Sequence, residues 1–134
     1  MQIKVYTDWG SRWNPWNAGI GVYITDFQGS VIEKRYKNLW VKTNNEAEYL
    51  GAYFGMKRAI EIWWKEIELL MDSKLVIEQL SGNWKIKKEE LRQIHSDITS
   101  LIQEADIHIK YTWIARDFNQ EADRLSNIAM DNLI

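Results

Sequence analysis

The chain has 134 residues, a formal net charge of −2 and no cysteine. Its length suits one domain with a real core, and its 46% hydrophobic and 27% charged residues are proportions of a soluble globular protein. The absence of cysteine excludes disulfides, thiolate zinc sites and cysteine nucleophiles. The slight negative charge argues against binding nucleic acid through overall basicity, although it leaves room for a local basic patch.

The amino-terminal segment predicts a three-stranded antiparallel meander. Residues 2–8, 20–26 and 31–37 alternate polar and apolar side chains, and the turn sequence FQGS joins the last two. Because a strand begins at the second residue, we expect no signal peptide and a cytoplasmic protein. No apolar run is long enough to span a membrane, so we also expect no membrane partner.

The middle of the chain changes from strands to alternating helices and strands. Apolar residues recur at helical spacing from 45 to 62, and Asn44 or Asn45 can serve as the N-cap of this helix. The nearly continuous apolar segment 67–72 is typical of a strand buried on both faces, and a helix is predicted over 73–80.

The carboxyl-terminal part continues this alternation. We predict a helix over 88–104, a strand over 107–114 and a helix over 119–132. Three antiparallel strands followed by alternating helices and strands indicate a mixed α/β sheet with helices packed on it, in one domain of residues 1–134.

The densest basic cluster lies before the helix at 88–104. Lys85, Lys87 and Lys88 are interleaved with Trp84 and Ile86. This pattern fits either a solvated lysine face or an edge that contacts phosphate groups.

Four acidic residues stand where the sequence ends a strand or opens a helix: Asp8, Glu48, Asp72 and Asp123. Such an arrangement can gather negative charge at one point. Carboxylates held close together raise each other's pKa or require a cation between them, and a divalent metal is the obvious cation. The alternative is that these residues are exposed acids or helix caps.

The motifs YTDWGSRWNPWNAGIGVYI, KTNNEAEYLGA, LLMDSKLVIEQLSGNWKIK and WIARDFNQEADRLSNIA occur in this order. Together they resemble a type 1 ribonuclease H over nearly the whole chain. The resemblance implies a five-stranded mixed sheet, three antiparallel strands then two parallel, flanked by helices. It also implies an endonuclease that hydrolyses the RNA strand of an RNA/DNA hybrid.

The resemblance assigns catalysis and metal binding to the same four carboxylates. It implies two Mg²⁺ ions, with Mn²⁺ as a possible substitute, since hard oxygen ligands suit hard cations. Asp8 would bridge both ions, Asp72 and Glu48 would hold the ion that activates water, and Asp123 would complete the leaving-group side. Glu46 is a rival of Glu48, because two residues that close on a helix cannot both face the site.

The resemblance also implies contacts with a hybrid. Ser11, Asn14 and Asn44 match positions that touch the sugars of the RNA strand, whereas Thr43 and Asn45 match positions near a phosphate of the DNA strand. Turn and cap chemistry would suit these residue types equally well.

Arg116 lies in the loop before the last helix, where some relatives place a mobile histidine. It can contact the scissile phosphate electrostatically, but it stays protonated and cannot act as a general base. His95 and His108 fall within a predicted helix and a predicted strand, so we interpret both as structural. The basic protrusion of some relatives is missing, and we therefore expect a modest, salt-sensitive affinity for the hybrid.

The chain contains eight tryptophans, an unusually high number for 134 residues. Several stand where turns and a helix end favour glycine, which reaches positive φ without strain. They are Trp9, Trp13, Trp16, Trp40, Trp63 and Trp64. We hypothesise that UGA codons meaning glycine were read here as tryptophan, in which case folding requires these side chains to point to solvent. The alternative is a naturally tryptophan-rich variant that stacks bases.

The sequence thus predicts a monomeric, metal-dependent ribonuclease acting on RNA/DNA hybrids. A second hypothesis is a catalytically impaired hybrid-binding domain, in which Trp9 and Trp13 block the substrate groove. A third keeps the fold but cuts another substrate, such as branched DNA.

Overall fold

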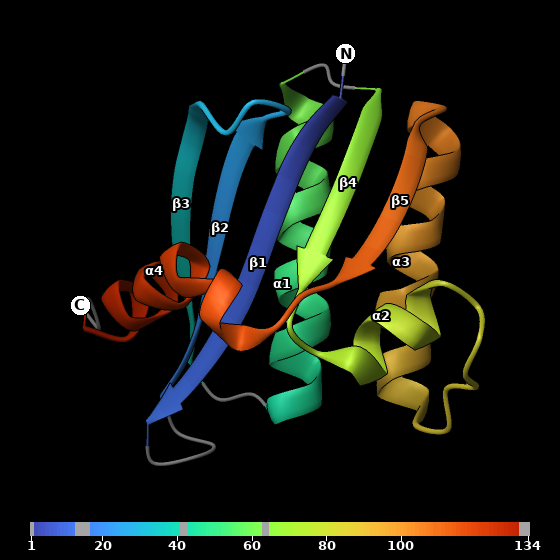
Figure 1. Cartoon of the computed structure of the whole chain (residues 1–134). Coiled ribbons are helices and arrows are strands. Elements are labelled where there is room, and N and C mark those ends of the chain that lie inside the picture. The colour runs from blue at the N-terminus through green and yellow to red at the C-terminus, as the bar shows by residue number, and fades with distance from the viewer. Residues whose placement is uncertain (1, 13–16, 41–42, 63–64, 132–134) are drawn as a thin grey trace.

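A computed structural model of the chain describes residues 2–12, 17–40, 43–62 and 65–131 (Figure 1). The elements follow in the order β1 (Gln2–Arg12), β2 (Asn17–Asp26), β3 (Val31–Trp40), α1 (Asn44–Glu61), β4 (Glu66–Met71), α2 (Lys74–Leu80), α3 (Glu89–Ala105), β5 (His108–Trp113), the 3-10 helix η1 (Arg116–Phe118) and α4 (Gln120–Asp131). The predicted elements are therefore confirmed, with shifts of a few residues at their ends.

The strands form one five-stranded sheet in the order β3-β2-β1-β4-β5. β1 pairs antiparallel with β2, and β2 with β3, whereas β4 is parallel to both β1 and β5. This confirms the predicted mixed sheet. The sheet lies between two helical layers, with α4 on one face and α1 and α3 on the other (Figure 1).

The observed N-cap of α1 lies one residue before Asn44 and two before Asn45, the two predicted N-caps. Thr43 is the N-cap, and its hydroxyl accepts a hydrogen bond from the backbone N–H of Glu46 at 3.3 Å. The Glu46 carboxylate lies 2.9 Å from the same hydroxyl and also reaches back to the Thr43 backbone N–H. The prediction of Asn44 or Asn45 was wrong because this reciprocal capping box satisfies two free helix-end donors at once.

The main core lies between the sheet and the helices α1 and α3. Ile3 and Val5 of β1, Leu69 of β4, Met56 of α1 and Ile98 of α3 are all fully buried in it. Hydrophobic burial on this scale fixes the strands and α1 as one rigid unit. The carboxyl ends of β1 and β4 and the first turns of α1 are thereby held at one edge of the sheet.

On the opposite face, α4 packs directly on the backbone of β2. A Cβ atom at Gly21 would lie 2.1 Å from the Ala122 carbonyl oxygen, so a side chain there would force α4 away. This close approach requires glycine and sets where the first turn of α4 meets β1.

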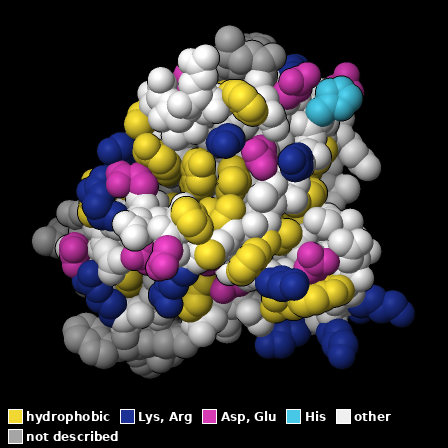
Figure 2. Space-filling view, in the orientation of Figure 1, with side chains coloured by type: hydrophobic (Ala, Val, Ile, Leu, Met, Phe, Trp, Pro, Cys, Tyr) yellow, Lys and Arg dark blue, Asp and Glu magenta, His cyan; other side chains and the backbone are white. Residues whose placement is uncertain are grey.

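Acidic and basic side chains are interspersed over α4, whereas hydrophobic side chains gather over the middle of the same face (Figure 2).

Two tryptophans of the glycine hypothesis lie within the described strands. Trp9 was predicted in a loop, but β1 continues through it to Arg12, because residues 9–12 stay paired with β2. Trp40 ends β3 with φ of 62°, in the left-handed region that favours glycine. Trp13, Trp16, Trp63 and Trp64 lie outside the described residues. None of the helices within the described ranges is long and apolar enough to cross a membrane.

Candidate active site

The four predicted carboxylates line one cavity of about 590 Å³. Asp8 comes from β1, Glu48 from the first turns of α1, Asp72 from the position directly after β4 and Asp123 from the first turn of α4. The sheet register explains part of this convergence: Tyr6 pairs with Leu70 in the parallel ladder, so Asp8 and Asp72 each follow two residues beyond the same rung.

Asp8 is the most deeply placed of these acids, with 7% of its surface exposed. Its Oδ1 accepts a hydrogen bond from the backbone N–H of Trp9 at 2.8 Å. Burial raises the pKa of Asp8 to about 8, and the charge of Asp72 and a hydrogen bond with Asp123 add to the increase. The cavity therefore disfavours ionised Asp8 unless a cation offsets the charge.

Glu48 is held by donors on both carboxylate oxygens. The indole Nε1 of Trp9 donates to Oε1 at 2.6 Å, and the Ser73 hydroxyl donates to Oε2 at 2.5 Å. Burial raises the pKa of Glu48, although these two hydrogen bonds oppose the increase. Since Glu46 is engaged in the helix cap, the structure places Glu48, and not Glu46, in the cavity.

Asp72 is oriented by a residue that sequence reasoning did not assign to the site. The Asn119 side chain donates to Asp72 Oδ2 at 3.4 Å and to the Thr7 carbonyl at 2.9 Å. Asn119 is only 2% exposed and stands directly before α4. Its sequence position indicated only a helix start, because the partners of its amide are far away in the chain.

Asp123 is anchored through the helix that carries it. Its carbonyl oxygen accepts hydrogen bonds from the Ser126 hydroxyl at 2.7 Å and the Asn127 side chain at 3.0 Å. In the same helix, Glu121 forms an ion pair with Lys34 of β3 at 3.0 Å. These contacts fix the first turn of α4 against the sheet.

The chemistry of this donor set suits a divalent cation. Four carboxylates supply only hard oxygen ligands, and a bound cation would offset the burial and the neighbouring charge that raise the pKa of Asp8. Within the described residues, however, no three His, Asp or Glu side chains are already arranged around one ion position. Glu48 in particular is turned to Trp9 and Ser73 as its partners.

Two of the predicted substrate contacts line the same cavity. Ser11 of β1 has a buried hydroxyl without a hydrogen-bond partner among the described residues, and Arg116 of η1 also reaches the cavity. An unpaired buried hydroxyl is costly, so Ser11 is available to bind a polar ligand group. Asn14 lies outside the described residues.

The remaining substrate predictions concern the first turn of α1. Thr43 caps the helix, and Asn44 is its exposed first residue. Asn45 lines a separate hollow of about 530 Å³. The same hollow is lined by Trp84 and by the basic cluster Lys85, Lys87 and Lys88. The structure thus brings Asn45 together with the lysines that sequence analysis singled out, whereas it gives Thr43 a structural role.

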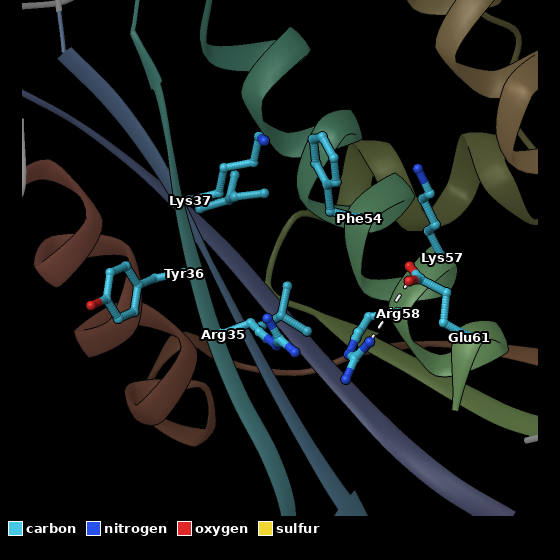
Figure 3. Close-up of a pocket in the computed structure, with 9 residues that line it drawn as sticks. Arg35, Tyr36, Lys37, Phe54, Lys57, Arg58 and Glu61 are labelled. Atoms are coloured by element: carbon cyan, nitrogen blue, oxygen red, sulfur yellow. Dashed lines mark ion pairs between the residues drawn. The ribbon is translucent and has the colours of Figure 1, made fainter. Parts of the chain in front are cut away.

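A third hollow of about 350 Å³ lies between β3 and α1 (Figure 3). Although it is rich in basic residues, Arg58 is committed to Glu33 at 2.6 Å and to Glu61 at 3.7 Å. Lys37 lies 4.9 Å from the centre of the Phe54 ring. Among the described residues that line this groove, Glu61 is the only acid, so the candidate chemistry belongs to the cavity around Asp8.

Comparison with known proteins agrees with this fold. Residues 10–129 match the sequence family described as "Reverse transcriptase-like". The chain is 39% identical to the bifunctional protein Rv2228c of Mycobacterium tuberculosis over 132 residues, 98% of this chain. That match spans 36% of the length of the mycobacterial protein, so the chain corresponds to about a third of it. It is also 30% identical to the ribonuclease H of Hydrogenovibrio crunogenus, covering 99% of this chain and 98% of the relative.

Solved structures give the same result. The RNase H1 of Halobacterium salinarum superposes with a TM-score of 0.92 at 30% identity, over 98% of this chain and 99% of the other. LC11-RNase H1, solved in complex with an RNA/DNA hybrid, superposes with a TM-score of 0.91 at 33% identity, over 96% of each chain. The chain therefore belongs to the ribonuclease H-like family.

Proposed function

We propose that this protein is a metal-dependent endonuclease that hydrolyses the RNA strand of RNA/DNA hybrids. The observation that carries the proposal is the convergence of Asp8, Glu48, Asp72 and Asp123 on one cavity from four separate elements. Family membership and the hybrid bound to LC11-RNase H1 support the substrate class.

The four carboxylates would hold Mg²⁺ ions, with Mn²⁺ as a substitute. When bound, such ions make a water nucleophilic at neutral pH and stabilise the charge on the leaving oxygen. The protein's own contribution is to keep these acids close despite their repulsion. Asn119 and the backbone N–H of Trp9 do this by donating to Asp72 and Asp8.

Selection of a hybrid would use groups on two sides of the cavity. Ser11 offers a buried hydroxyl next to the acids, and Arg116 offers a fixed positive charge for a phosphate. The hollow with Asn45 and three lysines would receive the other strand through its phosphates. The 2′-hydroxyl of RNA is the group by which such a surface distinguishes RNA from DNA.

The test is cleavage of an end-labelled RNA/DNA hybrid, compared with DNA duplex and RNA duplex, in Mg²⁺ or Mn²⁺. The proposal predicts cutting of the RNA strand of the hybrid and loss of that cutting in Asp8→Asn. Equal cutting of DNA duplex would contradict the substrate assignment, and equal activity of Asp8→Asn would contradict the site.

One observation favours a second candidate, a catalytically impaired domain that binds hybrids. Trp9 lines the cavity, and its indole N–H donates a hydrogen bond to Glu48, a residue proposed to bind metal. Hybrid binding without cleavage, in either metal, would support this candidate.

A further inference from the structure

We infer that Trp9 is a positioning residue that locks Glu48 against Ser73 and thereby weakens metal binding at the carboxylate cavity. This inference rests on the proposed function, because it requires Glu48 to serve as a metal ligand. The residue at position 9 would thus set the affinity of the cavity for metal.

We call the lock the two hydrogen bonds that Trp9 and Ser73 donate to Glu48, one to each carboxylate oxygen. Trp9 Nε1 lies 2.6 Å from Oε1, and Ser73 Oγ lies 2.5 Å from Oε2. Both bonds end on an ionisable carboxylate in a partly buried place, where charge-assisted hydrogen bonds are strongest. A cation that takes an oxygen of Glu48 must compete with the indole N–H or bind in the geometry it permits.

The Trp9 ring is itself held in place. It packs against a small buried cluster formed by Ala18, Ile20, Leu39 and Ala47. Rotation of the indole away from Glu48 would therefore break these apolar contacts, so the packing stabilises the hydrogen bond to Glu48. Ser73 is similarly fixed, because its hydroxyl also caps α2 by accepting from the Val76 N–H at 3.4 Å.

The two donors differ in what their loss would do. Ser73 belongs to a helix cap, and its removal would disturb α2 together with Glu48. Trp9 donates to Glu48 alone through Nε1, so replacing indole by a ring without N–H separates the lock from the packing. Trp9→Phe is consequently the informative variant.

The experiment is calorimetric titration of Mg²⁺ and Mn²⁺ into the wild-type chain and three variants, Trp9→Phe, Trp40→Phe and Asp8→Asn. Trp9→Phe should bind metal about tenfold more tightly, since one hydrogen bond to a charged group no longer competes. Trp40→Phe is the matched control, because Trp40 is exposed and does not line the cavity, and its affinity should equal that of wild type. Asp8→Asn should lose the binding.

Unchanged or weaker binding by Trp9→Phe would overturn the lock, provided that Asp8→Asn abolishes binding. If the Asp8→Asn variant binds metal as wild type does, the metal site and the lock both fail. If the phenyl ring of Trp9→Phe does not pack, a Trp9→Gly variant serves as a second test. Trp9→Gly should also bind metal more tightly than wild type. Near-ultraviolet circular dichroism checks that each variant is folded.

Discussion

Trp9 and Trp40 were both placed at glycine-like positions by sequence, yet the fold treats them in opposite ways. Trp9 lies in the extended strand β1, packs on a buried cluster and donates to Glu48. Trp40 has φ of 62° and 57% of its surface exposed. The backbone therefore favours glycine at position 40, whereas at position 9 only the side chain conflicts with the proposed chemistry.

This difference separates two kinds of cost. At position 40 the cost is backbone strain, which a large side chain pointing to solvent does not recover. At position 9 the tryptophan adds apolar packing to the fold, but its hydrogen bond restricts the Glu48 carboxylate. The expectation that all such tryptophans point to solvent is met by Trp40, whereas Trp9 is half-buried and contradicts it.

The largest expected effect on stability is at position 9. Trp9→Gly should lower the free energy of unfolding by about 2–3 kcal/mol, because it removes apolar contacts with the cluster around Ile20. Urea denaturation measures it, with Trp9→Phe as a control that keeps most of the packing. A stabilising Trp9→Gly would show that the ring is strained in its place.

Asp8→Asn should stabilise the metal-free protein, on the order of 1–3 kcal/mol at high pH. The folded-state pKa of Asp8 is raised to about 8, so its ionisation destabilises the fold as pH rises from about 4 through 8. The advantage of Asp8→Asn should therefore grow over this range and vanish near pH 4. Urea denaturation at several pH values in a chelator tests this, and an advantage that falls with rising pH would contradict it.

Trp40→Gly should have the opposite sign to Trp9→Gly. Relief of the left-handed backbone should raise the free energy of unfolding by about 1 kcal/mol. Asp106, with φ of 54° at the end of α3, is a matched site: Asp106→Gly should gain less, because aspartate tolerates this conformation better. Thermal and urea denaturation measure both variants, and destabilisation by Trp40→Gly would refute the strain.

The smallest effect is expected at the ion pairs that hold α4. Arg124 and Lys34 lower the pKa of Glu121 to about 2, so its contribution is present above about pH 4.5 and is lost as pH falls through 2. Because the pairs are largely exposed, Glu121→Gln should cost less than about 1 kcal/mol at neutral pH. Denaturation at pH 7 and pH 3 with added salt measures it; a cost that grows on acidification would contradict this sign.

The gene provides an independent test of the glycine hypothesis. This hypothesis predicts that codons 9 and 40 are UGA, read as glycine in the source organism, as are those of the tryptophans outside the described residues. The hydrogen bond from position 9 to Glu48 then exists only in the chain that carries tryptophan there. Sequencing the gene and analysing the native protein by mass spectrometry would decide the matter. Ordinary UGG codons at these positions would reject the hypothesis.

Much of the fold follows from local pattern, because alternation in the first three strands and the apolar strand before Asp72 specify the sheet. The convergence of Asp8, Glu48, Asp72 and Asp123 on one cavity followed from the resemblance to type 1 ribonuclease H, because strand ends and helix starts alone fitted exposed acids or helix caps equally well. The supporting residues did not, since Ser73 and Asn119 act through partners distant in sequence. Trp9 was misplaced because strand pairing of β1 continues beyond the alternating segment.

The most direct test of the account is cleavage of an RNA/DNA hybrid by Trp9→Gly and by Trp9→Gly combined with Asp8→Asn, beside the wild type in Mg²⁺. If the carboxylates are complete and Trp9 restrains them, Trp9→Gly cuts the RNA strand faster than wild type, and the added Asp8→Asn abolishes the cutting. A folded Trp9→Gly protein that binds the hybrid without cutting it, or a double variant that still cuts, would contradict the account.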